Sequence, residues 1–305
     1  MKDTLKIKGG LKLIINYFYR KKVVKLISLI LLFLSFSLLL SCNSTIPEIP
    51  SDQGRAYRII LVGIGEYQYI DDIGSGIPPQ EFVGSILAQW KFGDQQKGFD
   101  SITYLYNEEA TKTNILNHIN TELSNAKEED VSYFFFGGHG GFKNGESYLC
   151  AYDSLPSNMN SMITASELKN IFDSIKGIKV LVFDSCFCGG FIGKGNNLFL
   201  ENLIGIFNVI KEDKTTITGN NYKVLVSCRS SEICQTYSYN NLISGVFTYA
   251  IIEGASNGFP ADANKDSIIT LQEMYSYIKD RVASLGYSQE IQVYPENDTF
   301  PIVEY

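Results

Sequence analysis

The sequence predicts an α/β fold with a mostly parallel central sheet. Two observations carry this prediction: short continuous apolar runs have the length of strands, and amphipathic helical patterns lie between them. Strands that are apolar along their whole length are typical of a parallel sheet, because helices cover both of its faces. Strand, helix and strand in succession also imply right-handed crossover connections.

The predicted elements alternate along the chain. The strands are 57–64, 102–106, 131–136, 180–183 and 223–227. Apolar residues at helical spacing predict three helices, with Phe82, Ile86, Leu87 and Trp90 on the first, Ile115, Ile119 and Leu123 on the second, and Leu168, Ile171, Phe172 and Ile175 on the third. Thr164 and Glu167 have the spacing of a capping box at the start of the third helix. Two further helices are predicted over 247–253 and 271–285.

The composition excludes several classes of protein. The 305 residues are 45% apolar and 19% charged, which is ordinary for a folded chain and excludes a disordered one. Six cysteines are too few for a disulfide scaffold of this length. A net charge of −7 and a pI near 5.0 argue against a nucleic-acid partner.

The N-terminal segment has the pattern of a signal peptide. A basic stretch leads into residues 26–41, which carry no charge and are fewer than the roughly 20 residues that a membrane-spanning helix needs. The stretch ends in Leu39-Leu40-Ser41-Cys42, which resembles the lipobox of bacterial lipoproteins. The resemblance implies cleavage before Cys42 and lipid on its thiol. The chain would then be anchored outside the cytoplasm, on a bacterial cell membrane or outer membrane.

An uncleaved signal anchor is the alternative interpretation of this segment. The predicted organisation is a signal peptide over 1–41, a tether over 42–54 and one domain over 55–305. A domain of that length fits one large α/β unit better than two small ones.

A histidine follows one predicted strand and a cysteine follows another. Glycine pairs flank His139 after strand 131–136, and Asp184 and Ser185 precede Cys186 after strand 180–183. Ligand sites in parallel sheets lie beyond the carboxyl ends of the strands. We therefore expect His139 and Cys186 to lie near each other if their strands are neighbours.

These two residue types together suit nucleophilic catalysis. A thiol with a pKa of ~8.5 is mostly protonated at neutral pH. A nearby imidazole can take that proton and later give it to a leaving amine. The backbone N–H groups of Gly140 and Cys186 could hold the developing oxyanion. The pattern predicts a dyad of His139 as base and Cys186 as nucleophile, with no cofactor required for the chemistry; a small core cysteine and a structural histidine are the alternatives.

The sequence resembles the caspase-like superfamily of cysteine peptidases, and especially its bacterial metacaspase-like members. His139 in Gly-His-Gly-Gly and Cys186 in Asp-Ser-Cys match the base and nucleophile motifs. The histidine precedes the cysteine by about 50 residues, as in caspases. Weaker similarities extend over 57–302. The resemblance implies a caspase-like three-layer α/β/α sandwich and a peptide or protein substrate.

Departures from the family pattern leave alternatives open. Residues 74–81 differ from the usual start of the first helix. Cys188 stands where many relatives have serine. It could be the nucleophile itself, or it could trap Cys186 by oxidation.

The resemblance further implies an acidic pocket that takes Arg or Lys before the cut. Asp184 matches a family position, and Glu232, in the loop after strand 223–227, is the second candidate. A carboxylate pair would bind a guanidinium bidentately. Arg229 in the same loop counts against a purely acidic pocket, and a solvated loop carboxylate is the alternative for Glu232.

Residues 262–273 have the spacing of a twelve-position calcium loop. Possible ligands are Asp262, Asn264, Asp266, the Ile268 carbonyl, Thr270 and Glu273. Ser267 stands where such a loop needs glycine for a positive φ. Calcium binding is therefore predicted, with a polar turn that caps helix 271–285 as the alternative. Calcium activation of the peptidase would follow only by analogy with metacaspases.

Two rival functions remain open at this stage. One is a catalytically inactive caspase-like module for surface interactions, and the other is an acyl or thiol transferase that uses the same dyad. The resemblance also suggests self-processing in segment 194–222, after Lys194, Lys211 or Lys214.

Overall fold

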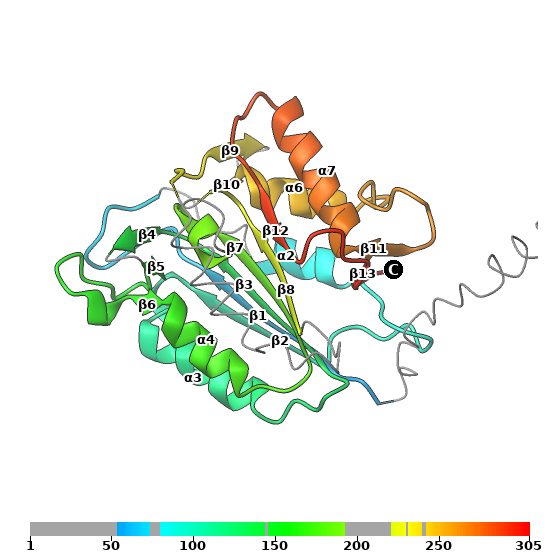
Figure 1. Ribbon diagram of the computed structural model, residues 1–305, viewed down its shortest axis with the longest axis horizontal. Coiled ribbons are helices and arrows are strands. Elements are labelled where there is room, and N and C mark those ends of the chain that lie inside the picture. Colours follow the sequence, from blue (N-terminus) through cyan, green and yellow to red (C-terminus); the bar gives the residue numbers. More distant parts are fainter. Residues whose placement is uncertain (1–53, 74–79, 144–145, 193–220, 230, 240–241) are drawn as a thin grey trace, which may run out of the picture. The chain divides into compact units, whose positions relative to one another are not determined.

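Figure 1 shows the computed structural model, which describes residues 54–73, 80–143, 146–192, 221–229, 231–239 and 242–305. The predicted signal peptide, Cys42, Lys194, Lys211 and Lys214 lie outside the described residues. The described residues belong to one compact unit, 52–305. No helix in this part of the chain is both long enough and apolar enough to cross a bilayer.

A six-stranded sheet lies at the centre of this unit. Its strands are β1 (Tyr57–Gly63), β2 (Ser101–Tyr106), β3 (Val131–Gly137), β7 (Ile178–Asp184), β8 (Tyr222–Val226) and β12 (Gln292–Tyr294). Their spatial order is β12-β8-β7-β3-β1-β2, and every pair is parallel except β12 with β8. The five predicted strands are the five parallel ones, so the predicted mostly parallel α/β fold is confirmed.

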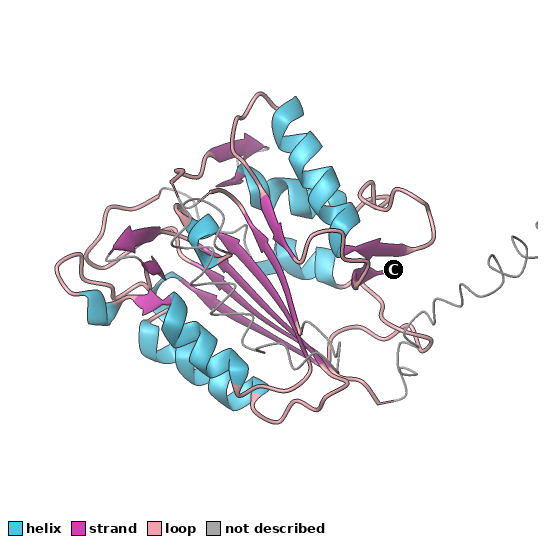
Figure 2. Cartoon of the chain, viewed as in Figure 1, coloured by secondary structure: helices cyan, strands magenta, loops and turns pink. Residues whose placement is uncertain are grey.

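Helices cover both faces of the sheet (Figure 2), which confirms the predicted three layers. The helices α3 (Lys112–Leu123) and α4 (Ala165–Asp173) pack on one face through buried residues such as Ile119 and Phe172. The helices on the other face are α2 (Gln80–Leu87), α6 (Val246–Gly254) and α7 (Leu271–Ser284). The β-branched and aromatic residues of the strands fill the space between these layers.

The capping box predicted at the start of α4 is only half formed. The Thr164 side chain accepts a hydrogen bond from the N–H of Glu167 at 3.3 Å. The Glu167 carboxylate instead pairs with Lys112 of α3 at 2.8 Å. A complete capping box joins Thr270 and Glu273 at the start of α7.

The short strands outside the central sheet were not predicted from the sequence. One small sheet joins β4 (Gly140–Lys143), β5 (Glu146–Leu149) and β6 (Ile163–Thr164). A hairpin joins β9 (Thr236–Tyr239) to β10 (Leu242–Gly245), and β11 (Ile268–Thr270) pairs with β13 (Pro301–Glu304). These strands have two to four residues each, too few for a period of two to be recognised.

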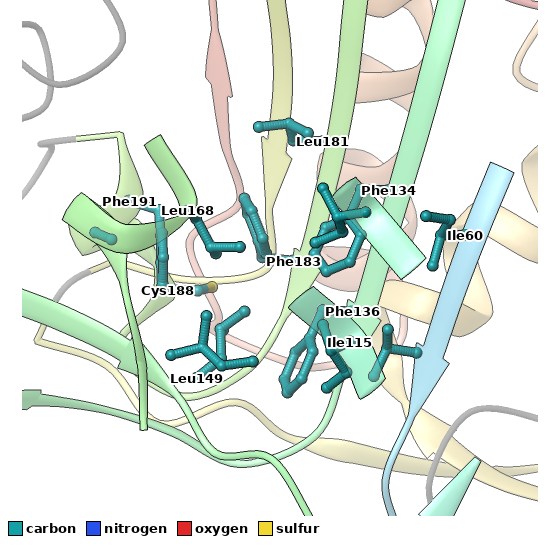
Figure 3. Close-up of a cluster of buried hydrophobic side chains, with 14 of the residues drawn as sticks. Ile60, Ile115, Phe134, Phe136, Leu149, Leu168, Leu181, Phe183, Cys188 and Phe191 are labelled. Atoms are coloured by element: carbon teal, nitrogen blue, oxygen red, sulfur yellow. The ribbon is translucent and has the colours of Figure 1, made fainter. Parts of the chain in front are cut away.

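Aromatic side chains of β3 and β7 form much of the core beneath α4 (Figure 3). The Phe134 side chain is fully buried, and its ring centroid lies 5.6 Å from that of Phe172 and 6.1 Å from that of Phe183. Both contacts are edge-to-face, the arrangement that aromatic quadrupoles favour. Phe134 therefore links the two strands that carry the candidate dyad to the helix layer.

We expect Phe134→Ala to lower the free energy of unfolding by about 3–5 kcal/mol, because it removes a buried ring and leaves a cavity. Urea denaturation followed by circular dichroism measures the change. The matched control is Phe142→Ala, whose side chain is 44% exposed and which should cost less than about 1 kcal/mol. Equal losses in the two variants would contradict this account of the core.

Candidate active site

His139 lies directly beyond the carboxyl end of β3. Its backbone is fixed on both sides, since its carbonyl accepts from Cys150 N–H at 2.9 Å and its N–H donates to the Tyr67 hydroxyl at 2.6 Å. The Tyr67 ring also packs on the imidazole, with 4.9 Å between ring centroids. The histidine is therefore held at one position on the edge of the sheet while its ring stays partly open to solvent.

A backbone carbonyl selects the tautomer of His139. Nε2 lies 2.8 Å from the carbonyl oxygen of Asp71. A carbonyl can only accept, so Nε2 carries the proton that it donates. In the neutral ring Nδ1 is then the basic atom, and it is the atom that can take a proton from a thiol.

Cys186 lies at the matching position beyond β7. The two strands pair in parallel with Gly137 opposite Asp184, and the N–H of Gly138 donates to the Asp184 carbonyl at 3.1 Å. His139 and Cys186 thus follow neighbouring strands at the same distance from that register position. The Cys186 side chain is half-buried, while that of Ser185 before it is buried.

A sharp turn follows the cysteine. Phe187 has a φ of +60°, a left-handed conformation that costs a residue with a side chain roughly 1–2 kcal/mol. The turn is held by the Phe187 N–H, which donates to the Glu232 carbonyl at 2.9 Å. The loop after β8 therefore helps to fix the conformation of the backbone that presents Cys186.

Cys234 makes the Cys186 thiol more acidic. Its thiol donates a hydrogen bond to the Cys186 sulfur, and this lowers the pKa of Cys186 to about 7 against the opposing effect of burial. A thiol of that acidity is substantially ionised at neutral pH, and the thiolate is the nucleophilic form. Cys234 had no signal in the sequence, because five residues of loop separate it from Cys228 and no motif marks it.

One pocket of about 200 Å³ contains the predicted dyad. Its lining residues include His139, Cys186, Cys234, Asp184, Gly245 and Thr248. The structure therefore brings together His139, Cys186 and Asp184, three of the predicted site residues. It leaves their side chains in contact with a space that a substrate group could enter.

The Asp184 carboxylate is buried at the start of α6. It accepts hydrogen bonds from the backbone N–H and the hydroxyl of Thr248, at 3.1 and 2.5 Å. Gly245 lies so close to this carboxylate that a Cβ there would collide with it. Burial raises the pKa of Asp184 to about 6, while the Thr248 bonds partly offset that rise. The group is mostly ionised at pH 7 and places a negative charge inside the pocket.

Glu232, the second predicted carboxylate, is not among the described residues that line this pocket. Its carboxylate accepts from the N–H of Arg229 at 2.9 Å and from that of Glu290 at 3.2 Å, and Arg229 itself pairs with the Glu290 side chain. Among the described residues that line the pocket, Asp184 supplies the carboxylate and Glu232 is absent. In this arrangement Glu232 organises its own loop, and its half-buried carboxylate is bonded to backbone N–H groups.

The register of the β4–β5 hairpin leaves the N–H of Gly140 pointing away from β5. Gly140 lies opposite Leu149, and the bond from Cys150 N–H to the His139 carbonyl makes this a non-hydrogen-bonded pair. A Cβ on Gly140 would lie 2.8 Å from the Cys186 carbonyl oxygen, so only glycine allows this close approach. The predicted oxyanion donors Gly140 and Cys186 are therefore neighbours.

Cys188 is closed to substrate. Its side chain is fully buried in the hydrophobic cluster that Figure 3 shows, near Phe191 and Leu149. Its sulfur lies 3.1 Å from the Ser227 hydroxyl and 3.7 Å from the Cys228 sulfur. This burial favours Cys186 over Cys188 as the candidate nucleophile.

Several of the predicted calcium ligands already make hydrogen bonds within the loop. The Glu273 carboxylate is held in the capping box by the N–H and hydroxyl of Thr270, at 2.9 and 2.8 Å. Asp262 is buried and accepts from two loop N–H groups and from the Tyr305 hydroxyl. Within the described part of the chain, the acidic side chains of this loop do not lie close enough together to form a group of three or more that could hold a metal ion.

The remaining predicted ligands of this loop also bond within it. The Asn264 amide bridges to Asp266, and the Ile268 N–H bonds to the Asp266 carboxylate. Ser267 has the positive φ, +70°, that a loop of this kind requires. These hydrogen bonds are also consistent with the alternative interpretation, a polar turn that caps α7. Calcium binding stays a prediction.

A family model gives independent support to the dyad region. Residues 81–193 match the metacaspase, peptidase C14 domain. This stretch contains both His139 and Cys186. The match supports a caspase-like cysteine peptidase. A peptidase domain of this kind implies a peptide or protein substrate.

Two solved structures are similar to this chain at low sequence identity. Protein GSU0716 from Geobacter sulfurreducens is 12% identical with a TM-score of 0.51, over 82% of this chain and 99% of that one. Caspase-1 from Spodoptera frugiperda is 10% identical with a TM-score of 0.48, over 81% of this chain and 87% of that one. No curated protein matches the chain.

Exposure predicts which cysteine reacts first. We expect a small alkylating reagent, added to the native reduced chain, to modify Cys186 well before Cys188, because Cys188 has no exposed surface. Peptide mass spectrometry after short labelling times measures the order. Labelling of the urea-unfolded chain is the control, since there both thiols should react at similar rates. Early modification of Cys188 in the native chain would exclude the buried position described above.

Proposed function

We propose that this chain is a cysteine endopeptidase that cleaves after Arg or Lys. The observation that carries the proposal is the single pocket that His139, Cys186 and Asp184 line together at the ends of neighbouring strands. The family match over 81–193 supports the reaction class. The buried carboxylate supports the preference for a basic side chain.

The proposed reaction uses the His139 and Cys186 side chains that line this pocket. His139 accepts the Cys186 thiol proton at Nδ1, and the thiolate attacks the scissile carbonyl carbon. The N–H groups of Gly140 and Cys186 donate to the oxyanion of the tetrahedral intermediate. The imidazolium then protonates the leaving amine, the C–N bond breaks, and water hydrolyses the thioester with His139 as base. Asp71, through its carbonyl, and Tyr67 are positioning groups in this scheme.

Burial and charge favour a cation in the pocket. An ionised carboxylate removed from water is unfavourable unless it has a charged or hydrogen-bonding partner. The Thr248 donors satisfy the Oδ2 atom of Asp184. A guanidinium or ammonium group that enters the pocket would supply the missing positive charge.

The proposal also includes a lipid anchor, calcium dependence and self-processing. Lipid on Cys42 would keep the peptidase on the outer side of a bacterial membrane. Calcium would have to displace the Glu273 carboxylate from its cap, so no catalytic step is assigned to it. Self-cleavage after Lys194, Lys211 or Lys214 fits a peptidase that prefers basic residues.

The dyad predicts a large loss of activity in two variants. We expect Cys186→Ala and His139→Ala each to lower kcat/KM on fluorogenic Arg or Lys peptides by at least about 10³-fold, because each removes a partner in proton transfer and attack. Cys150→Ala is the matched control for loss of a thiol near the site. A folded Cys186→Ala variant with near-normal activity would exclude Cys186 as the nucleophile. Absence of any cleavage by the unmodified chain would instead favour the catalytically inactive interaction module.

The pocket predicts a change of preference in Asp184→Asn. We expect this variant to lose about 10–100-fold in kcat/KM on Arg and Lys peptides, because a charge-assisted bond is lost. Glu232→Gln is the comparison, and its rates on the same peptides should stay within about twofold, since its carboxylate faces its own loop. Preferential cleavage after Asp by the unmodified chain would overturn the pocket assignment.

The raised pKa of Asp184 predicts a pH dependence of substrate binding. The carboxyl is neutral below about pH 6 and charged above it, so KM for a Lys peptide should fall as the pH rises from 5 to 7. KM measured across this range tests the prediction, and Asp184→Asn should abolish the trend. A KM that is equally pH-dependent in Asp184→Asn would assign the titration to another group.

A further inference from the structure

Three cysteine thiols lie close together near Cys186, the candidate nucleophile. The sulfur atoms of Cys188, Cys228 and Cys234 all lie within 4.8 Å of one another. The distance is 3.7 Å between Cys188 and Cys228, and 3.3 Å between Cys228 and Cys234. All three thiols are free. The proposed peptidase reaction uses none of these sulfur atoms as nucleophile or base.

The spacing of the three sulfurs matches that of a metal thiolate centre. Zinc bonds to sulfur at about 2.3 Å, so two sulfurs on one tetrahedral zinc lie roughly 3.8 Å apart. Ligand sets made of thiolates select soft or borderline ions and disfavour calcium and magnesium. We propose that Cys188, Cys228 and Cys234 form a binding site for one thiophilic divalent cation such as Zn²⁺, adjacent to Cys186.

The fold presents these ligands from two neighbouring strand ends. Cys188 begins the short helix η3 (Cys188–Phe191) after β7, and Cys228 follows β8 by two residues; both are fully buried. Cys234 lines the candidate active-site pocket, so an ion can reach the cluster from there. Tight packing of Cys188 and Cys228 would limit the reorganisation that binding requires.

A hydroxyl group is placed to support the ligands. The Ser227 oxygen lies 3.1 Å from the Cys188 sulfur and 2.8 Å from the Cys234 sulfur. When the ion binds, each thiol releases its proton to solvent and becomes a thiolate. The Ser227 hydroxyl can then donate to one of these thiolates, as outer groups around metal sites do.

Occupancy of the site would affect Cys186. Cys186 and Cys234 line the same pocket. An ion held by Cys234 would therefore lie beside the nucleophile and obstruct the approach of a reagent or a substrate carbonyl to the Cys186 sulfur. We infer that the bound ion slows both alkylation and peptide cleavage at Cys186. The second effect rests on the proposed function, and the binding itself does not.

Cobalt titration tests the site without any peptidase assay. The full chain is purified in detergent, reduced, freed of reductant and kept under inert gas, and Co²⁺ is added stepwise. We expect one Co²⁺ per chain, a near-ultraviolet thiolate-to-cobalt charge-transfer band, visible bands of tetrahedral cobalt, and displacement of all of them by Zn²⁺. A reduced chain that gives no charge-transfer band overturns the proposal and leaves the three thiols as hydrogen-bonded packing.

Single serine variants locate the ligands. Cys188→Ser, Cys228→Ser and Cys234→Ser should each weaken Zn²⁺ binding by at least about tenfold and reduce the charge-transfer band. Cys150→Ser, a buried free thiol outside the cluster, is the matched control and should bind like the unmodified chain. Circular dichroism identifies variants that fail to fold, and a Cys228→Asp variant, which keeps a ligand, then replaces a misfolded Cys228→Ser.

The Cys186→Ala variant separates this site from a site at the dyad. It should keep one-to-one Co²⁺ binding with an undiminished charge-transfer band, and loss of binding would assign the ion to His139 and Cys186 instead. Zn²⁺ should inhibit the unmodified peptidase reversibly, and Cys228→Ser should need a higher Zn²⁺ concentration for half-inhibition of its own activity. If the chain binds cobalt but cleaves no peptide, the proposed metal site is supported and only the proposed peptidase function is contradicted.

Discussion

The parallel pairing of β3 with β7 is the constraint on which the candidate site depends. Its register sets Gly137 opposite Asp184 and so carries His139 and Cys186 to adjacent points on one edge of the sheet. A shift of one residue would turn every side chain of the slipped strand to the other face of the sheet and separate the pair. Burial of Phe134 and Phe183, whose rings meet across the two strands, makes such a shift costly. The same apolar contacts that stabilise the fold therefore set the geometry of the site.

The sequence was sufficient for those parts of the molecule that follow from local pattern. Continuous apolar runs identified the five parallel strands, and glycine-flanked His139 and Cys186 identified the two strand ends that line one pocket. Asp184 was found through the family resemblance, and it lies in that pocket. The resemblance could not separate it from Glu232, because the direction of a loop side chain depends on which N–H groups it meets in the folded chain.

Other features depend on contacts between distant segments and had no signal in the sequence. The Asp71 carbonyl selects the His139 tautomer through its backbone, and any residue type offers a carbonyl. Cys234 reaches Cys186 because the loops after β7 and β8 run side by side. In segment 262–273, which has calcium-like spacing, some of the candidate oxygens take part in a helix cap and in loop hydrogen bonds. Spacing alone does not reveal whether an oxygen is already engaged.

The left-handed backbone of Phe187 has a consequence for how the molecule loses its function. The strands of the central sheet are stabilised by a large buried core. This strained turn is held by hydrogen bonds, one from its N–H to the Glu232 carbonyl and one from the Ser147 hydroxyl to its own carbonyl. Regions with few stabilising contacts open at lower free energy than the core. Warming or mild denaturant would first release the loop after β8 and let the turn relax. The chain would then keep its secondary structure while Cys186 and His139 no longer lined one pocket.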